Sequence, residues 1–328
     1  MLSIKIPGQK NPLTEEEKKY FSEKLNSAFQ IGEQIGISGY NSSAYKLQTP
    51  KGEEYVLKIP NNPQDNRWVE SQIGTEKISS HYLLGYEGKV VIPDMIELGQ
   101  RYIVEPYCGV PLTAQLYDYT LSNVEKENIA QQMGYFLNFL HQQKPQNKIG
   151  NIEICAPNCH HSLSEVFTYF EPHLSKEENK EWEKRITSFI NRDTSDEVAT
   201  LTHGDIRSQN VLYNPQTKKV AVIDWETLRT RAVYRDFVPM ASFGMSYHFL
   251  EKVVSSYNQA EKENDIKINL QKLLLLHLLS KYHEIGRCAI MREKKNQPHS
   301  PTPMKIILNK HIAPIEHIQQ QLFERENC

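Results

Sequence analysis

The sequence predicts an α+β protein with two lobes, a small lobe built on an antiparallel sheet with one helix and a larger, mainly helical lobe. The chain has 328 residues, which is too long for one small hydrophobic core and suits two. Strand and turn signals fill its first quarter, whereas apolar residues recur at helical spacing from about residue 110 onward. We therefore expect an N-terminal lobe over residues 1–107 and a C-terminal lobe over residues 108–328.

The elements of the small lobe follow from turn residues and β-forming runs. Two strand-like segments, 43–48 and 54–59, flank the turn-former Thr49-Pro50-Lys51-Gly52, which predicts a hairpin. Residues 68–84 are expected to be helical, and two more strand-like segments follow at 90–92 and 101–104.

The elements of the large lobe are mainly helices around one short hairpin. Apolar residues at helical spacing predict a helix that ends at His141: they are Ile129, Met133, Phe136, Leu137 and Leu140. A hairpin of strands 210–213 and 220–223 is expected across Asn214-Pro215. The other predicted helical segments are 164–189 with a break near Pro172, 249–286 with a buried stretch at 270–279, and 304–323.

The composition is that of an ordinary soluble globular protein and excludes several classes of partner. The 38 basic and 40 acidic residues give a net charge of -2, so no overall positive field would attract nucleic acid or an anionic membrane. No apolar run approaches the roughly 20 residues that span a bilayer, and the first residues lack the apolar core of a signal peptide. Five scattered cysteines, an odd number, do not indicate a disulfide framework. We expect a reduced, cytoplasmic protein without an obligate protein partner.

The segment from Thr202 to Asn210 carries the residues of a phosphoryl-transfer site. Transfer to a hydroxyl needs a carboxylate near the attacking oxygen and oxygen ligands for Mg²⁺ at the phosphates. Asp205 can take the first role, and Asn210 can turn its amide oxygen toward a metal. Asp224 closes the next strand and can hold the same ion, because the hairpin between the two residues folds them back toward each other.

The motif around Asp205 resembles that of the aminoglycoside phosphotransferase and choline kinase superfamily, whose members are relatives of protein kinases. It consists of His203-Gly204-Asp205, four further residues and Asn210, followed downstream by Ile-Asp224-Trp-Glu. The resemblance implies a protein-kinase-like fold and ATP and Mg²⁺ as cofactors. It implies Asp205 as the catalytic base, with Asn210 and Asp224 as metal ligands. Asp-Trp-Glu in place of the Asp-Phe-Gly of protein kinases favours the small-molecule branch. Asp236 resembles the family's downstream aspartate, which supports the catalytic loop.

The same resemblance assigns nucleotide-binding residues upstream of the motif. Lys58 is placed to hold the α- and β-phosphates, and Glu76 is the expected helix partner of that lysine, with Glu70 as the rival. A small, polar loop at 35–43, with Gly39, Ser42 and Ser43, can offer backbone N–H groups to phosphates. Residues 104–112 resemble the linker that meets adenine, with Glu105 and Tyr107 as its candidate contacts.

Several side chains outside this motif could have either a functional role or a purely structural one. Cys155, Cys159, His160 and His161 invite a zinc site, with His173 as a possible further ligand, but free cysteines are more often simply buried. His203 is expected to be a structural hydrogen-bonding residue. An acceptor pocket is expected around 157–170 and in the C-terminal helices, where the candidates are His248, His283, Glu284, Arg287 and the acidic Glu251, Glu261, Glu263 and Asp265.

The sequence therefore predicts a small-molecule kinase that transfers the γ-phosphate of ATP to a hydroxyl group. An aminoglycoside-like antibiotic is one acceptor class, and a metabolite such as choline, ethanolamine, thiamine or a sugar is the other. A nucleotide-binding pseudokinase or regulatory protein is the alternative, disfavoured because Lys58, Asp205, Asn210 and Asp224 are all intact. A protein kinase is disfavoured because no Ala-Pro-Glu element lies between Asp224 and Asp236.

Overall fold

The structure is a computed structural model of the whole chain. It describes residues 5, 9–25, 28–35, 42–62, 86, 88, 90–91, 97–99, 102–112, 120–143, 148–149, 152–153, 177, 180, 199–225, 228–242, 247–260, 266–270 and 273. By internal packing the chain divides into two compact units. The first unit comprises Met1–Leu112, Lys148–Glu153 and Gln209–Leu228, and the second comprises Thr113–Asn147, Ile154–Ser208 and Arg229–Cys328.

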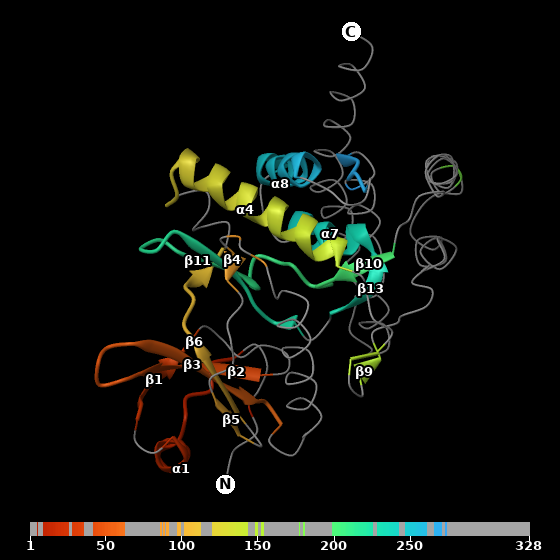
Figure 1. Ribbon diagram of the computed structural model, residues 1–328. Helices are drawn as coiled ribbons and strands as arrows, with labels where there is room; N and C mark the ends of the chain where they lie inside the picture. Colours follow the sequence, from red (N-terminus) through yellow and green to blue (C-terminus); the bar gives the residue numbers. More distant parts are fainter. Residues whose placement is uncertain are drawn as a thin grey trace. The chain divides into compact units, whose positions relative to one another are not determined.

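The first unit contains a five-stranded antiparallel sheet. Its order is β1-β2-β3-β6-β5, with bounds Gln30–Gln34, Ser42–Gln48, Glu54–Pro60, Tyr102–Pro106 and Glu97–Gly99 (Figure 1). Strands β2 and β3 pair without interruption from Ser42 opposite Pro60 to Gln48 opposite Glu54, which confirms the predicted hairpin. Strand β6 confirms the strand that was expected at 101–104.

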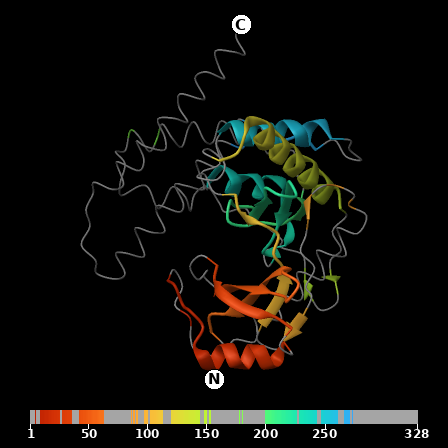
Figure 2. The ribbon, with the colours of Figure 1, turned by 90° about the vertical axis from the view of Figure 1, so that its left-hand side faces the viewer.

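A helix that the sequence did not lead us to expect packs against this sheet. Helix α1 (Glu15–Lys24) begins with a capping box, in which Thr14 accepts a hydrogen bond from the backbone of Glu17 while the Glu17 carboxylate accepts one from the backbone of Thr14. Phe21 of α1 is fully buried and lies in one apolar cluster with the sheet residues Tyr45, Leu47, Leu57, Ile59, Tyr102 and Val104. Figure 2 shows α1 alongside the strands of this sheet.

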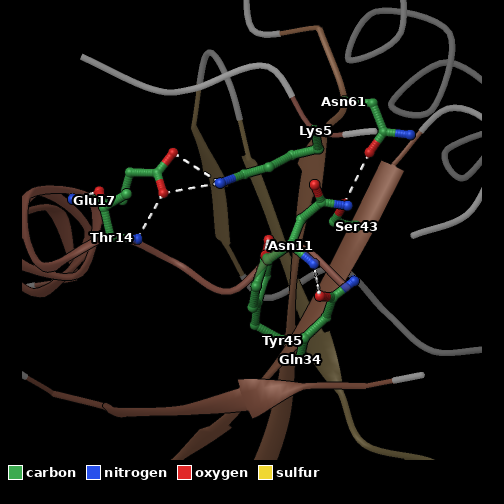
Figure 3. Close-up of polar contacts among 8 residues, drawn as sticks. All are labelled: Lys5, Asn11, Thr14, Glu17, Gln34, Ser43, Tyr45 and Asn61. Carbon is green, nitrogen blue, oxygen red and sulfur yellow. Dashed lines mark hydrogen bonds and ion pairs between the residues drawn. The ribbon is translucent and has the colours of Figure 1, made fainter. Parts of the chain in front are cut away.

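A buried set of polar contacts, which we call the N-terminal network, joins the start of the chain to α1 and to the sheet (Figure 3). Lys5 Nζ lies 2.8 Å from Glu17 Oε2, and the two side chains are 2% and 1% exposed. Asn11 N donates to Gln34 Oε1 at 2.5 Å, and Ser43 Oγ donates to Asn61 Oδ1 at 2.8 Å. The N-terminal network consists of Lys5, Asn11, Thr14, Glu17, Gln34, Ser43, Tyr45 and Asn61.

A second, four-stranded sheet in the first unit contains the other predicted hairpin. Its order is β4-β12-β11-β7, with bounds Val90–Val91, Lys219–Val222, Val211–Asn214 and Val110–Pro111. Strands β11 and β12 are antiparallel neighbours, as expected. The strand expected at 90–92 exists as β4, but it pairs in parallel with β12 rather than with the antiparallel strands of the small lobe. Short strands β8 (Lys148–Ile149) and β9 (Ile152–Glu153) pair with each other.

Two long helices, α4 (Asn123–Gln142) and α8 (Tyr247–Gln259), lie side by side in the second unit (Figure 1). Helix α4 confirms the helix predicted to end near His141, and it begins with a capping box between Ser122 and Glu125. The remaining elements are the antiparallel pair β10 (Ala199–Thr202) and β13 (Arg229–Ala232), the 3-10 turn η3 (Val233–Arg235) and helix α7 (Phe237–Ser242).

The helical prediction for 249–286 is wrong in one part. Helix α8 ends at Gln259, and residues 266–269 are not helical. The Asn258 side chain explains this, because its amide donates to the Ile268 carbonyl and accepts from the Ile268 N–H, which satisfies that backbone outside a helix. Helical backbone returns at Leu270 and Leu273, and Leu273 is fully buried.

The other predicted helices lie outside the described residues, apart from Glu177 and Lys180, which are helical. They are the segments 68–84, 304–323 and most of 164–189. Within the part of the chain that the structure describes, no helix is both long and apolar enough to cross a membrane.

Candidate active site

The loop that follows β10 is held by a buried carboxylate of the second unit. Asp236 is fully buried, and its oxygens accept hydrogen bonds from two successive backbone N–H groups of the loop. His203 N donates to Asp236 Oδ2 at 3.0 Å, and Gly204 N donates to Asp236 Oδ1 at 2.5 Å. The role expected for Asp236, support of this loop, is confirmed by these contacts.

His203 and Gly204 shape the loop immediately before Asp205. The His203 ring is fully buried, and its Nδ1 accepts a hydrogen bond of 3.2 Å from Asp205 N, so His203 is the structural residue that the sequence led us to expect. Gly204 has a φ of 84°, a left-handed conformation that a side chain would strain. Glycine at this position therefore lets the chain turn while Asp236 holds the backbone on both sides of the His203–Gly204 peptide.

Asp205 presents its carboxylate next to an arginine two residues along the loop. Arg207 Nε donates to Asp205 Oδ1 at 2.7 Å, and the Arg207 Nη2 group contacts the same oxygen. The Asp205 side chain is 19% exposed, so it is shielded yet reachable, whereas that of Arg207 is 40% exposed. A nearby guanidinium favours the ionised form of a carboxylate, which is the form that can accept a proton.

Two residues behind Asp236 extend this contact set away from the loop. His141, at the end of α4, places Nε2 3.0 Å from Asp236 Oδ2, and the other ring nitrogen, Nδ1, lies 3.2 Å from the hydroxyl oxygen of Tyr257 in α8. We call His141, His203, Gly204, Asp236 and Tyr257 the Asp236 network. Burial and the charge of Asp236 raise the pKa of Tyr257, so its hydroxyl keeps its proton.

The two predicted metal ligands sit at the ends of one hairpin of the first unit. Ile223 N donates to the Asn210 carbonyl oxygen at 3.0 Å, which fixes the residue before Asp224 against Asn210. Asn210 is buried, and Asp224 has a φ of 69°, an uncommon backbone conformation for a residue other than glycine. Trp225 anchors this turn, because it is buried and its Nε1 donates to the Val222 carbonyl at 3.0 Å. Backbone outliers of this kind concentrate at functional sites.

The donor set of this hairpin fits a divalent cation of the magnesium type. An amide oxygen from Asn210 and a carboxylate from Asp224 are hard oxygen ligands, and Mg²⁺ is usually held by one or two such groups together with water and phosphate oxygens. Among the described residues no group of three His, Cys, Asp or Glu side chains gathers in the manner of a closed protein metal site. Two such ligands leave the remaining positions around an octahedral Mg²⁺ ion to water and phosphate oxygens.

Lys58 of β3 is brought together with Glu105 of β6. Lys58 Nζ lies 2.7 Å from Glu105 Oε1, and their side chains are 11% and 5% exposed. The pairing is diagonal across the two strands, because Lys58 lies opposite Ile103 and Glu105 lies opposite Val56. A buried ammonium and carboxylate in contact hold each other in place, so Glu105 fixes the Lys58 amine through its side chain.

The predicted linker and phosphate loop are described only in part. Glu105 is paired in the sheet through its backbone, and non-strand backbone begins at Tyr107, whose N–H donates to the Glu54 carbonyl at 3.1 Å. The Tyr107 ring lies 5.9 Å from Lys46 Nζ. Ser42 and Ser43 are the first residues of β2, and the buried Ser43 hydroxyl donates to Asn61.

The remaining sequence candidates fall outside the described residues, with two exceptions. His248 and Glu251, both on α8, are exposed, with His248 Nδ1 3.7 Å from Glu251 Oε2. Outside the description lie Gly39, Glu70, Glu76, Cys155, Cys159, His160, His161, His173, Glu261, Glu263, Asp265, His283, Glu284 and Arg287.

Three residues of this geometry were not singled out from the sequence. Arg207 lies inside the motif, so its spacing of two from Asp205 was available as a signal. His141 ends an apolar helical stripe, where a buried polar residue indicates a hydrogen-bonded role. Tyr257 carried no signal of its own, because only the packing of α8 against α4 brings it to His141.

Comparison with known proteins identifies the fold. A family model described as "Phosphotransferase enzyme family" matches residues 33–266. No curated protein sequence matches the chain. The similar solved structures include three with 15–19% sequence identity to this chain.

The first of these is the streptomycin–ATP ternary complex of APH(2'')-IIa, with 19% identity, coverage of 91% of this chain and 95% of that one, and a TM-score of 0.56. The GDP complex of aminoglycoside 2'-phosphotransferase-IIIa has 16% identity, coverage of 92% and 97%, and a TM-score of 0.63. Macrolide 2'-phosphotransferase MphH from Brachybacterium faecium, as the apoenzyme, has 15% identity, coverage of 87% and 99%, and a TM-score of 0.55. The predicted fold, α+β and protein-kinase-like, is thereby confirmed.

Proposed function

Because this chain belongs to the phosphotransferase enzyme family, we propose that it transfers the γ-phosphoryl group of a magnesium-bound nucleoside triphosphate to a hydroxyl group of a small molecule. The observation that carries this proposal is the loop around Asp205. A buried aspartate, Asp236, holds two consecutive backbone N–H groups of this loop, and the Asp205 carboxylate remains partly exposed. Such rigid support is what a catalytic base requires for its orientation.

In the proposed reaction Asp205 orients the acceptor hydroxyl and accepts its proton. The acceptor oxygen forms a bond to the γ-phosphorus while the bond from that phosphorus to the β–γ bridging oxygen breaks, and the nucleoside diphosphate leaves. Arg207 holds the Asp205 carboxylate in one orientation through its Nε contact. Asp236, His203 and Gly204 hold the backbone and do not take part in proton transfer.

The nucleotide and metal roles fall on residues of the first unit. Asn210 and Asp224 would hold Mg²⁺, which when bound neutralises charge on the phosphate oxygens. Lys58 would contact the α- and β-phosphates, with its amine positioned by Glu105. Gly39, Ser42 and Tyr107 complete the proposed nucleotide contacts, and Glu76 stays the proposed helix partner of Lys58. The Ser43 side chain is not proposed as a contact, because its hydroxyl is fully buried and bonded to Asn61. The proposed lobe boundary stays near residue 107.

We take a hydroxylated antibiotic as the first acceptor class to test and a hydroxylated metabolite as the second. The similar structures include an aminoglycoside phosphotransferase in complex with streptomycin and a macrolide phosphotransferase. ATP is the proposed donor, and GTP belongs in the test because one of the similar structures holds GDP. The proposed enzyme acts in the cytoplasm without a protein partner.

The test is a nucleotide-consumption screen with purified protein, Mg²⁺ and either ATP or GTP. The acceptors are aminoglycosides, macrolides, choline, ethanolamine, thiamine and simple sugars, and each product is checked by mass spectrometry for one added phosphoryl group. The Asp205→Asn variant should lose turnover by about 100-fold or more and still bind nucleotide, since general-base catalysis typically contributes that much. Glu127→Gln is the matched control, because Glu127 is exposed and its ion pair with Lys252, at 3.7 Å, lies at the surface.

Two results would count against the proposal. Tight nucleotide binding without consumption of any acceptor would favour the pseudokinase or regulatory alternative. Full turnover by Asp205→Asn would remove Asp205 from the catalytic role, whatever the acceptor.

A further inference from the structure

Tyr257 lies deep in the second unit, and its hydroxyl points at a histidine ring. The residue is 1% exposed, and its hydroxyl oxygen is 3.2 Å from His141 Nδ1. Its ring packs edge-on against Phe237, with centroids 5.3 Å apart, and lies 5.5 Å from the His141 ring. These aromatic contacts restrict the rotation of both rings. The packing of the interior therefore holds the Tyr257 hydroxyl against the His141 imidazole.

The hydrogen bonds around His141 permit one neutral arrangement. An ionised Asp236 carboxylate has no proton to give, so His141 Nε2 must carry the proton that lies between them. In the neutral ring Nδ1 is then an acceptor, and a donor must face it. The Tyr257 hydroxyl, 3.2 Å from Nδ1, is positioned to be that donor. Tyr257 on one side and Asp236 on the other thus select one tautomer of the neutral His141 ring and one orientation of that ring.

One face of α4 brings Tyr257 to this position. Gly134, Asn138 and His141 follow one another at spacings of four and three, which places them on the same side of the helix. A Cβ on Gly134 would lie 2.6 Å from the Val253 carbonyl oxygen and 2.8 Å from Tyr257 N, so glycine permits the close approach of α8. Asn138 Nδ2 donates to the Tyr257 carbonyl at 3.1 Å and fixes the rotation of α8.

We propose that Tyr257 is a positioning residue, which orients His141 and thereby, through Asp236, the backbone of the loop that carries Asp205. The series of contacts runs from the Tyr257 hydroxyl to His141, from His141 to Asp236, and from Asp236 to the N–H groups of His203 and Gly204. The effect on catalysis rests on the proposed phosphotransferase function, whereas the effect on His141 does not.

The first measurement reads the His141 ring without any assay of activity. Nitrogen NMR of protein labelled at histidine shows which ring nitrogen carries the proton, and subtraction of the His141→Gln spectrum identifies His141 among the 12 histidines. We expect a proton on Nε2, which faces Asp236, and a changed or broadened pair of signals in Tyr257→Phe. A His141 ring without a proton on Nε2 in the wild-type protein, or an unchanged His141 in Tyr257→Phe, would overturn the proposal.

The second measurement is a double-mutant cycle on turnover. Tyr257→Phe should lower kcat about tenfold, because loss of the buried hydrogen bond weakens the support of the loop that carries Asp205. The KM for nucleotide should stay within about twofold, because Tyr257 does not contact the substrate. In His141→Gln the amide nitrogen of the glutamine can donate to Asp236 whether residue 257 is tyrosine or phenylalanine. In that background Tyr257→Phe should therefore cost less than about twofold in kcat.

Tyr45→Phe is the matched control for stability. Tyr45 is also 1% exposed, and its hydroxyl donates a hydrogen bond of 2.6 Å to the Asn11 carbonyl oxygen in the N-terminal network of the first unit. If Tyr257 only stabilised the fold, both variants would lower the melting temperature alike and the folded protein would keep its kcat, and that result would refute positioning. Absence of turnover in the wild-type protein would refute the proposed function instead, and the NMR result would still decide whether Tyr257 sets the His141 ring.

Discussion

The N-terminal network of the first unit and the Asp236 network of the second are both built around a buried carboxylate. Glu17 accepts from the Lys5 amine at 2.8 and 2.9 Å and from Thr14 N at 2.9 Å. Asp236 accepts from His203 N, Gly204 N and His141 Nε2. The donors to Glu17 belong to the start of the chain and to a helix cap, whereas two donors to Asp236 belong to the backbone next to Asp205. Burial alone therefore does not show whether a carboxylate supports stability or activity. The location of the groups that donate hydrogen bonds to it does.

The largest effect is expected for Asp236→Asn. Three N–H groups converge on the two carboxylate oxygens, so an amide NH₂ in either orientation must face at least one of them. We expect a loss of about 3 kcal/mol in the free energy of unfolding, measured by urea denaturation, because a buried donor loses its partner. We also expect kcat of the folded variant to fall about 100-fold, because the loop at Asp205 loses its support. Retention of more than half of the wild-type kcat would show that the loop holds its shape without Asp236.

Lys5→Met should affect stability alone. It leaves the Glu17 carboxylate buried without its ammonium partner, which costs about 3 kcal/mol in the free energy of unfolding. Lys18→Met is the matched control on the same helix, since the ion pair of Lys18 with Glu15 is exposed and contributes less than about 1 kcal/mol. The double variant Lys5→Met with Glu17→Gln should recover part of the loss. A fall in kcat comparable to that of Asp236→Asn would contradict the distinction between the two networks.

Gly134→Ala tests the packing that places Tyr257. The added methyl group would lie 2.6 Å from Ser256 Cβ and 2.6 Å from the Val253 carbonyl oxygen, so α8 must shift away from α4. Overpacking of this kind costs about 2 kcal/mol in stability. If the shift also moves the Tyr257 hydroxyl, kcat falls in parallel with the loss in Tyr257→Phe. Val124→Ala, at a position of α4 that is 69% exposed, is the control and should leave both quantities nearly unchanged.

The elements that the sequence predicted correctly are those whose signals are local. The β2–β3 hairpin follows from a turn-former between two β-forming runs, and the Asp205 motif is contained in nine residues. A local signal was also present for α1, because Thr14 and Glu17 have capping-box spacing, but that helix is mostly charged and its apolar face is short. Charged segments of this kind resemble loops when only apolar periodicity is considered.

The features that the sequence did not predict depend on contacts between distant residues. Strand β4 has two residues, too few to carry a register, so its parallel pairing with β12 was not predictable. His141 and Asp236 are 95 residues apart, and His141 and Tyr257 are 116 apart. Only the packing of α4 with α8 and the course of the chain after β13 bring these side chains together. Lys58 likewise meets Glu105 through the register of β3 and β6.

The smallest effect is expected for Tyr45→Phe, the counterpart of Tyr257→Phe in the N-terminal network. The Tyr45 hydroxyl donates to the Asn11 carbonyl at 2.6 Å, and its loss should lower the free energy of unfolding by about 1 kcal/mol with kcat unchanged. Burial, with a contribution from the Glu17 charge, raises the pKa of Tyr45 to about 12.

This pKa gives the stability difference a definite dependence on pH. Because the folded-state pKa lies above the unfolded value of about 10, the unfolded state releases the Tyr45 proton first as the pH rises. The stabilisation by Tyr45 is thus fully present below about pH 10 and is lost as the pH rises toward 12. Urea denaturation of wild-type and Tyr45→Phe protein between pH 8 and pH 11 should show the difference shrinking above pH 10. A difference that stays constant, or a fall in kcat at pH 8, would mean that this hydroxyl has a role closer to that of Tyr257.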